Sequence, residues 1–199
     1  DLSPIISLTV SLSGENPATI ESRMLRVVDF MRNASLVISV RDLLKTYAAE
    51  NHMANAKIEK DLHSAQLALV FDNRRLGNLE DLQKRFPGNA LNANQVVDPK
   101  ESGAKYLPIS TQIIAVKSDI FATQEKINNL KNRSEQMKLL AQFIEQAKPV
   151  LFSEVSGIKL TESLLSVENQ MRNKISPDNL PLLEVLDRVR FDLPNIEVQ

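Results

Sequence analysis

The feature that most constrains the fold is a long heptad-like repeat in the second half of the chain. Between residues 113 and 144 apolar side chains recur at steps of three and four, and neither Gly nor Pro follows Pro108 until Pro149. The repeat consists of Ile113, Val116, Ile120, Ile127, Leu130, Met137, Ala141 and Ile144, with Thr123 and Ser134 in the gaps. A stripe this narrow packs against one partner helix rather than into a globular core. We therefore predict one long helix that begins near Pro108 and ends at Pro149.

A second stretch, from residue 57 to residue 86, has a matching stripe. Its apolar members are Ile58, Leu62, Ala65, Leu69, Leu76, Leu79 and Phe86, with polar interruptions at Asp72 and Gln83. Pro87 and Gly88 end this run, and residues 87–108 form a polar connection, which we predict to be a loop. Two runs of similar length joined by one loop predict an antiparallel helical hairpin over residues 44–149. In this hairpin Ile120, Ile127 and Leu130 should be buried against Ile58, Leu62, Leu69 or Leu76.

The two ends of the chain carry shorter patterns. Residues 6–13 alternate between apolar and polar side chains, which predicts a strand, and Asn16 and Pro17 then have the residue types of a helix start. Apolar residues at helical spacing predict a helix from Ile158 to Ile175, followed by a further turn or two from Leu182 to Leu186. Residues 188–193 alternate again and predict a second strand that pairs with the first.

The predicted fold class is therefore α+β and mostly helical. A small α/β base would comprise residues 1–43 and 150–199, and the coiled-coil-like hairpin of residues 44–149 would project from it. The composition suits this arrangement, because 43% of the 199 residues are hydrophobic while only 5% are aromatic and only 5 are Gly. Long helices need few glycines, whereas phosphate-binding loops and tight turns need many.

The chain lacks the residue patterns of common catalytic and metal sites. It has no Cys, so thiolate nucleophiles and sulfur-ligated metals are excluded, and no nucleotide-binding or hydrolase motif occurs. The two histidines, His52 and His63, are three helical turns apart, which is too far to share a metal, and we interpret them as surface residues. The net charge is -1, and the sequence has no stripe of basic residues of the kind that nucleic-acid binding requires. We predict no catalytic, cofactor-binding or metal-binding residue, and a non-enzymatic protein.

Two surfaces are candidates for interaction. Apolar residues lie beside each stripe, and we predict that Phe71, Phe121, Leu139 and Phe143 form an interface between copies of the chain, because a lone hairpin would leave them exposed. A mildly basic stretch comprises Arg74, Arg75, Lys84 and Arg85. The simpler interpretation is a solvated helix face balanced by neighbouring acidic residues. The functional hypothesis is contact with an anionic polysaccharide or with a neighbouring subunit.

The order of these elements resembles the polysaccharide co-polymerases, the Wzz-type chain-length determinants. An extended segment leads into the helix Pro17-Ala18-Thr19-Ile20-Glu21-Ser22-Arg23-Met24-Leu25, with Phe30 further along, and a long helix begins after a polar loop at Tyr106-Leu107-Pro108. The resemblance covers residues 4–148, and residues 150–187 exceed the family pattern. It implies two flanking transmembrane helices, a location at the periplasmic face of the bacterial inner membrane, and ring-like homo-oligomers.

The resemblance also implies a function and partners. Members of that family regulate the length of a surface polysaccharide such as O-antigen, capsule or exopolysaccharide, so a polysaccharide polymerase and its glycan chain are the implied partners. The alternative is a periplasmic hairpin adaptor of a secretion or efflux system, which would need a lipoyl-like β-domain beside its hairpin. A sugar-binding accessory domain is a third hypothesis, but it would need clustered aromatic residues that the sequence lacks.

Overall fold

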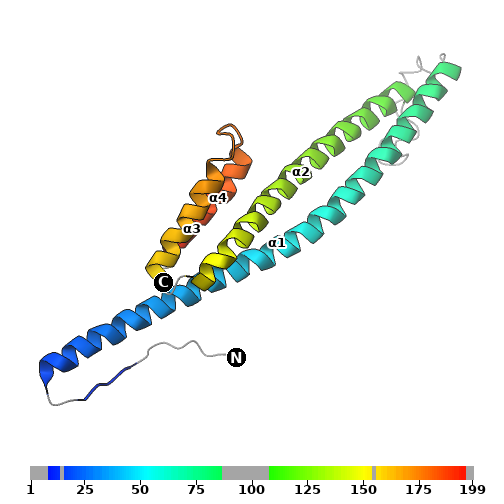
Figure 1. The fold of residues 1–199 in the computed structure, drawn as a ribbon. Helices are drawn as coiled ribbons and strands as arrows, with labels where there is room; N and C mark the ends of the chain where they lie inside the picture. The colour runs from blue at the N-terminus through cyan, green and yellow to red at the C-terminus, as the bar shows by residue number, and fades with distance from the viewer. Residues whose placement is uncertain (1–8, 14–15, 87–107, 154–155, 196–199) are drawn as a thin grey trace. The chain divides into compact units, whose positions relative to one another are not determined.

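The computed structural model describes residues 9–13, 16–86, 108–153 and 156–195. Within them the chain forms four helices: α1 (Pro17–Arg85), α2 (Ile109–Ser153), α3 (Gly157–Arg172) and α4 (Leu180–Asn195) (Figure 1). No strand occurs among these described residues. The chain divides into two compact units. The first contains Asp1–Ala48 and Leu140–Gln199, and the second contains Ala49–Leu139.

The start of α1 confirms the predicted helix cap. Pro17 is the first residue of the helix, and the backbone N–H of Ala18 donates to Oδ1 of Asn16 over 3.0 Å. The carbonyl of Asn16 accepts the first helical bond, from the N–H of Ile20. This arrangement satisfies a backbone donor that would otherwise lack a partner, and the fixed φ of Pro17 suits the first turn.

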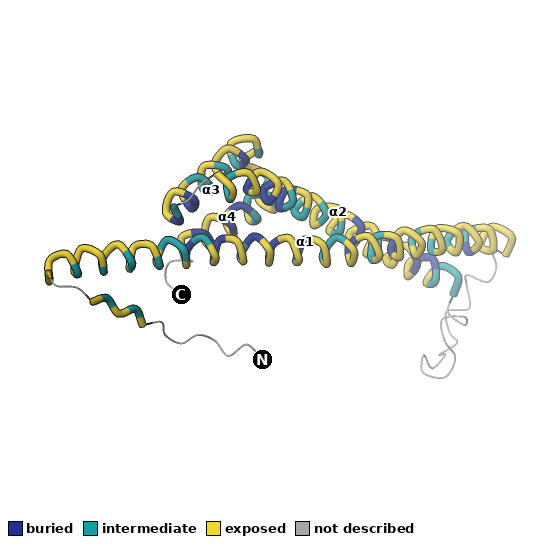
Figure 2. The backbone as a smooth tube through the Cα atoms, turned by 60° about the horizontal axis from the view of Figure 1, so that its bottom comes forward, coloured by how far each residue is buried: buried dark blue, intermediate teal, exposed yellow. Residues whose placement is uncertain are grey.

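The second unit is the predicted hairpin. Along α1 the buried and half-buried residues that follow the alternating steps are Asn51, Asn55, Ile58, Leu62, Ala65, Leu69, Asp72, Leu76 and Leu79. Along α2 they are Ile109, Ile113, Val116, Ile120, Thr123, Ile127, Leu130, Ser134 and Met137. We call these two rows the seam, and Figure 2 shows burial following it along both helices. Both sets have the four–three spacing of a coiled coil, so the prediction of a two-helix hairpin is confirmed.

Direct contacts define the register of this hairpin. Leu79 is buried in one cluster with Ile113, Val116 and Ile120, and Leu69, Leu76 and Ile109 pack against it. The prediction that Ile120 is buried between the two helices is therefore confirmed, because Leu69 and Leu76 pack against its cluster. At the other end of the unit, the side-chain amide of Asn51 donates to the carbonyl of Met137 and accepts from Asn55. An amide in this position holds the two helices in a fixed register, because its bonds would be lost if they slid.

The seam is shorter than predicted at one end. Phe86 is 55% exposed and follows the last residue of α1, and Gln83 is also exposed. The register gives the reason. Leu79 is in one cluster with Ile113, only one turn from the start of α2 at Ile109, so Phe86, two turns beyond Leu79, extends past the described part of α2. The predicted loop lies outside the described residues except for Pro108.

The predicted α/β base is wrong where the structure describes it. Residues 188–193 belong to α4, and residues 9–13 form no strand; residues 1–8 lie outside the described part of the chain. Leu186, Val189 and Leu193 are fully buried and fall at helical spacing, whereas Phe191, which completed the apparent alternation, is exposed. The alternation was therefore produced by a helix whose outer face also carries an aromatic residue.

The helices of the first unit extend further than predicted. α3 matches the expected helix closely, but α4 has 16 residues where only a turn or two was predicted. α3 and α4 pack against each other (Figure 1). α2 continues past Pro149 to Ser153, so the prediction that Pro149 ends the helix is also wrong. Proline removes one backbone donor, and close to a helix end the loss of this single bond is tolerated.

Candidate functional site

The two histidines do not lie in a common site. His52 and His63 are both exposed on α1, and three helical turns separate them by about 16 Å along the axis. No group of three or more His, Cys, Asp or Glu side chains with the geometry of a metal site occurs among the described residues. None of the helices in the described part of the chain has the length and apolarity needed to span a bilayer.

The four basic residues do not form one patch. Arg74, Arg75, Lys84 and Arg85 are all exposed on α1. At about 100° per residue, Arg74 and Arg85 fall on the same side of the helix, whereas Arg75 and Lys84 point to opposite sides of it. Lys84 lies 3.8 Å from Asp81, so an exposed ion pair already compensates its charge. This geometry weakens the polysaccharide-contact hypothesis for the four residues as a set.

The four predicted interface residues separate into two classes. Phe71 and Phe121 are 62% and 70% exposed, whereas Leu139 and Phe143 are only 9% and 0% exposed. Leu139 and Phe143 are therefore core residues of this chain, and the prediction that they lie on an open face is wrong. Around them the narrow stripe of α2 widens, because Leu140, Ile144 and Ala147 are buried too. A wide apolar face packs against more than one element.

The exposed apolar residues of the hairpin lie on identifiable sides of it. Val70, Ile114 and Phe121 each come directly after a seam residue of the same heptad position, namely Leu69, Ile113 and Ile120. The position that follows such a seam residue lies toward one side of the hairpin. It is the side on which Lys117 pairs with Glu80 over 3.3 Å. We call Val70, Ile114 and Phe121 the side patch. Phe71, one residue further along α1, points toward the opposite side, so Phe71 and Phe121 do not share one surface.

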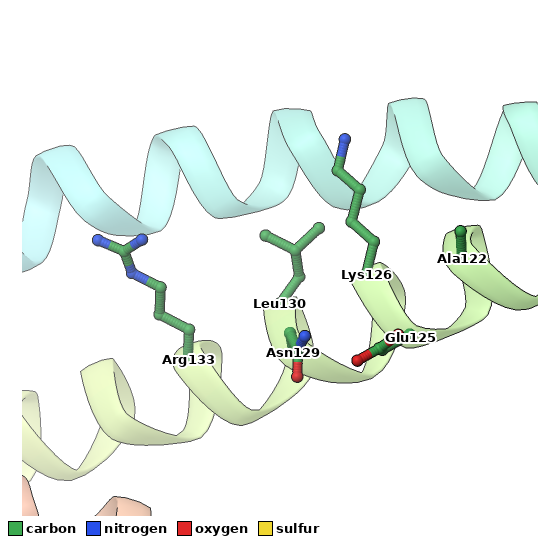
Figure 3. Close-up of a pocket in the computed structure, with 6 residues that line it drawn as sticks. All are labelled: Ala122, Glu125, Lys126, Asn129, Leu130 and Arg133. Atoms are coloured by element: carbon green, nitrogen blue, oxygen red, sulfur yellow. The ribbon is translucent and has the colours of Figure 1, made fainter.

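A hollow on α2 of the same unit has mixed chemistry. It has a volume of about 360 Å³ and is lined by Ala122, Glu125, Lys126, Asn129, Leu130 and Arg133. In Figure 3 Lys126, Leu130 and Arg133 extend toward α1, while Glu125 and Asn129 do not. All six lining residues come from one helix, so no second element closes the hollow. Ligand sites normally enclose most of the ligand surface, and this hollow lacks that property.

The first unit contains a buried polar network that the sequence analysis missed. The carboxylate of Glu168 is fully buried on α3, and its Oε1 accepts a hydrogen bond from Nε of Arg172 over 2.7 Å. Its Oε2 lies 3.3 Å from Nε of Arg190 on α4, although it accepts no hydrogen bond among the described residues. Arg172 also donates to Asp187 of α4, and Arg190 donates to Asn169 of α3.

The ion pairs and hydrogen bonds of this network have a structural role. The pKa of Arg172 is raised above its usual value, chiefly by the hydrogen bond to Glu168 and then by that to Asp187, so the guanidinium stays charged. A buried carboxylate held by two arginines is fixed in place, and removing one partner would leave a charge uncompensated. The network therefore joins α3 to α4. No sequence motif marks it, since its members lie up to 22 residues apart on two helices.

A second polar contact joins α4 to α1 within the same unit. The buried hydroxyl of Tyr47 donates to Oδ2 of Asp192 over 2.6 Å. The guanidinium of Arg188 lies 5.2 Å from the centre of the Tyr47 ring and 3.6 Å from Asp192. This geometry combines a cation–π contact with an ion pair.

No protein-family model, curated protein or solved structure matches the chain.

Proposed function

We propose that the chain is a non-enzymatic scaffold that assembles with copies of itself and regulates the length of a bacterial surface polysaccharide. The proposed place of action is the periplasmic face of the inner membrane. The observation that carries the proposal is the coiled-coil hairpin of the second unit with its exposed side patch. The seam residues of α1 and α2 bury each other. Large apolar residues outside the seam remain exposed and can contact other copies.

The side patch supports self-association on physical grounds. Val70, Ile114 and Phe121 are each more than 60% exposed, and the pairing of Glu80 with Lys117 places them on one side of the hairpin. Large apolar side chains that are exposed on one side of a folded protein support an interaction site there, because their exposure to water is unfavourable. A contact between different surfaces of neighbouring copies closes into a ring when the rotation between them permits.

The assignment to polysaccharide length rests on the resemblance of residues 4–148 to the polysaccharide co-polymerases. Two parts of that pattern have counterparts in the structure: the helix start at Asn16 and Pro17, and the long helix that begins after Pro108. The expected strand at residues 188–193 is helical, so the base adds no support. The proposed partners are a polysaccharide polymerase and its growing glycan.

The test is deletion of the gene followed by complementation, with the length distribution of extracted surface polysaccharide measured by gel electrophoresis. We expect deletion to change the preferred length and the wild-type gene to restore it. The His52→Ala and His63→Ala variants should restore it equally well, because both side chains are exposed and share no site. An unchanged length distribution in the deletion strain would refute the polysaccharide role.

A periplasmic hairpin adaptor is the second candidate, and the antiparallel coiled-coil hairpin is the observation that favours it. The same deletion strain distinguishes the two functions. If the chain is an adaptor, deletion abolishes secretion or efflux of a substrate and leaves the polysaccharide length unchanged. If the chain is a length regulator, deletion has the reverse pattern.

A further inference from the structure

One face of α1 in the first unit is hollowed into two adjoining grooves. The first has a volume of about 530 Å³, and its apolar lining includes Phe30, Val37 and Ile38. The second has a volume of about 410 Å³ and is lined by Leu44, Leu151 and Phe152 among others. Arg41 lines both grooves and separates them. The α1 residues that line them recur every three or four positions from residue 30 to residue 48, so the grooves follow a single face of the helix.

The charge of this face is positive. Arg41, Lys45 and Lys148 line the grooves, and no carboxylate does. Lys45 already pairs with Asp42, and Lys148 pairs with Glu145. Arg41 takes part in none of the ion pairs formed by the described residues. The face is thus apolar at both ends, with an uncompensated guanidinium between them.

The outer face of α4 has the complementary pattern. On the side of α4 opposite to its buried residues, four residues recur at steps of four, three and four: Leu180, Glu184, Asp187 and Phe191. The buried residues of α4 are Leu186, Val189 and Leu193. Leu180 and Phe191 are each 70% exposed, and three helical turns separate them by about 16 Å. Glu184 lies between them and is exposed. Two apolar side chains therefore flank a carboxylate, as two apolar grooves flank Arg41.

We propose that the Arg41 face of one copy receives the outer face of α4 from a second copy, with Glu184 pairing with Arg41 and Leu180 and Phe191 occupying the two grooves. The proposal rests on the proposed self-association and specifies a surface for it. Both surfaces belong to the first unit and differ from each other, so the contact is heterologous. Opposite charge at the centre selects the partner and its register, and the apolar ends supply the buried area.

The absence of Cys from the chain makes disulfide trapping a direct test. Ala34→Cys and Ala48→Cys place a thiol in the first and second groove, and Leu180→Cys places one on α4. A groove variant mixed with the α4 variant and mildly oxidised should give a disulfide-linked heterodimer for at least one groove position. Arg32→Cys is the matched control, because Arg32 lies nine residues from Arg41 and so on the opposite side of α1, and it should give no heterodimer. Equal trapping by the control, or none by either groove position, would overturn the proposal.

Charge reversal tests the same contact without cysteines. Arg41→Glu and Glu184→Arg should each weaken self-association at least about tenfold in sedimentation velocity, and the double variant should recover it because the pair is restored with opposite sign. Arg32→Glu should have no effect, and circular dichroism checks that every variant is folded. Oligomers that survive both single reversals would place the interface elsewhere and leave the proposed function intact. A wild-type protein without oligomers would instead refute the self-association itself. If a small amphiphile or another protein occupies the Arg41 face instead, neither charge reversal changes self-association.

Discussion

At the scale of single residues, two glycines in helices have opposite surroundings. A Cβ added to Gly157 would lie 2.5 Å from Cβ of Leu36 and 3.0 Å from the carbonyl oxygen of Asn33. A Cβ added to Gly77 would meet nothing within 4 Å. Gly157 begins α3, so its lack of a side chain allows that helix to approach α1 closely within the first unit.

This contrast gives a matched pair of stability predictions. Gly157→Ala should lower the free energy of unfolding by about 1 to 3 kcal/mol, because the new methyl group overlaps a Cβ and a backbone atom that cannot rotate away. Gly77→Ala should raise it by up to about 1 kcal/mol, because alanine favours the helix at an open position. Urea denaturation followed by circular dichroism measures both effects. A neutral Gly157→Ala variant would show that α3 does not approach α1 this closely.

The buried tyrosine gives a second prediction at this scale. Tyr47→Phe removes the hydroxyl that donates to Asp192, and we expect a loss of about 1 to 3 kcal/mol in the free energy of unfolding. Asp192→Asn in the Tyr47→Phe background tests the pairing, because the cost of the second change should then be smaller than in the wild type. Strictly additive losses would indicate that the two side chains do not interact.

At the scale of elements, the helices of the hairpin could be predicted from the sequence, whereas the helix over residues 188–193 could not. The two rows of the seam were predictable because each helix faces one partner, so the four–three spacing of Ile113, Val116 and Ile120 is readable from the chain alone. The spacing of Val189 and Phe191 predicts a strand because six alternating residues outweigh the helical spacing of the buried Leu186, Val189 and Leu193. Short apolar runs do not distinguish a strand from a helix with an exposed aromatic residue.

The seam gives a prediction for the second unit. Ile120→Ala removes a side chain that is buried in the cluster with Leu79, and we expect it to lower the free energy of unfolding by about 2 to 5 kcal/mol. Ile114→Ala, six residues away on the outer side of the same helix, should change it by less than about 0.5 kcal/mol. Equal losses at both positions in urea denaturation would contradict the assignment of the seam.

At the scale of the whole molecule, the candidate surfaces were only partly predictable. Phe71 and Phe121 lie outside the seam and are exposed, as their sequence positions indicate. Leu139 and Phe143 also lie beside the stripe, but they are buried, which the spacing of apolar residues along α2 alone does not indicate. The Arg41 grooves escaped prediction for the same reason, since Ile144 and Leu151 of α2 line the second groove and Ser156 lines the first.

The burial of these residues decides which variants can probe assembly. A charge at Phe143 would unfold the first unit, because the side chain is fully buried, so it does not test an interface. Phe121→Glu places the charge in the side patch instead. Ser118→Glu is the control, because it adds the same charge to the same helix at an exposed position that is already polar.

The most direct test of the central claim is the mass of the natural protein, extracted from cells in mild detergent, measured by mass photometry over a series of concentrations. If the chain is a self-assembling scaffold, the wild type and Ser118→Glu form assemblies of several copies. Phe121→Glu forms smaller assemblies, because its carboxylate would have to be desolvated in the contact. A wild-type protein that remains a single copy at every concentration would contradict the account.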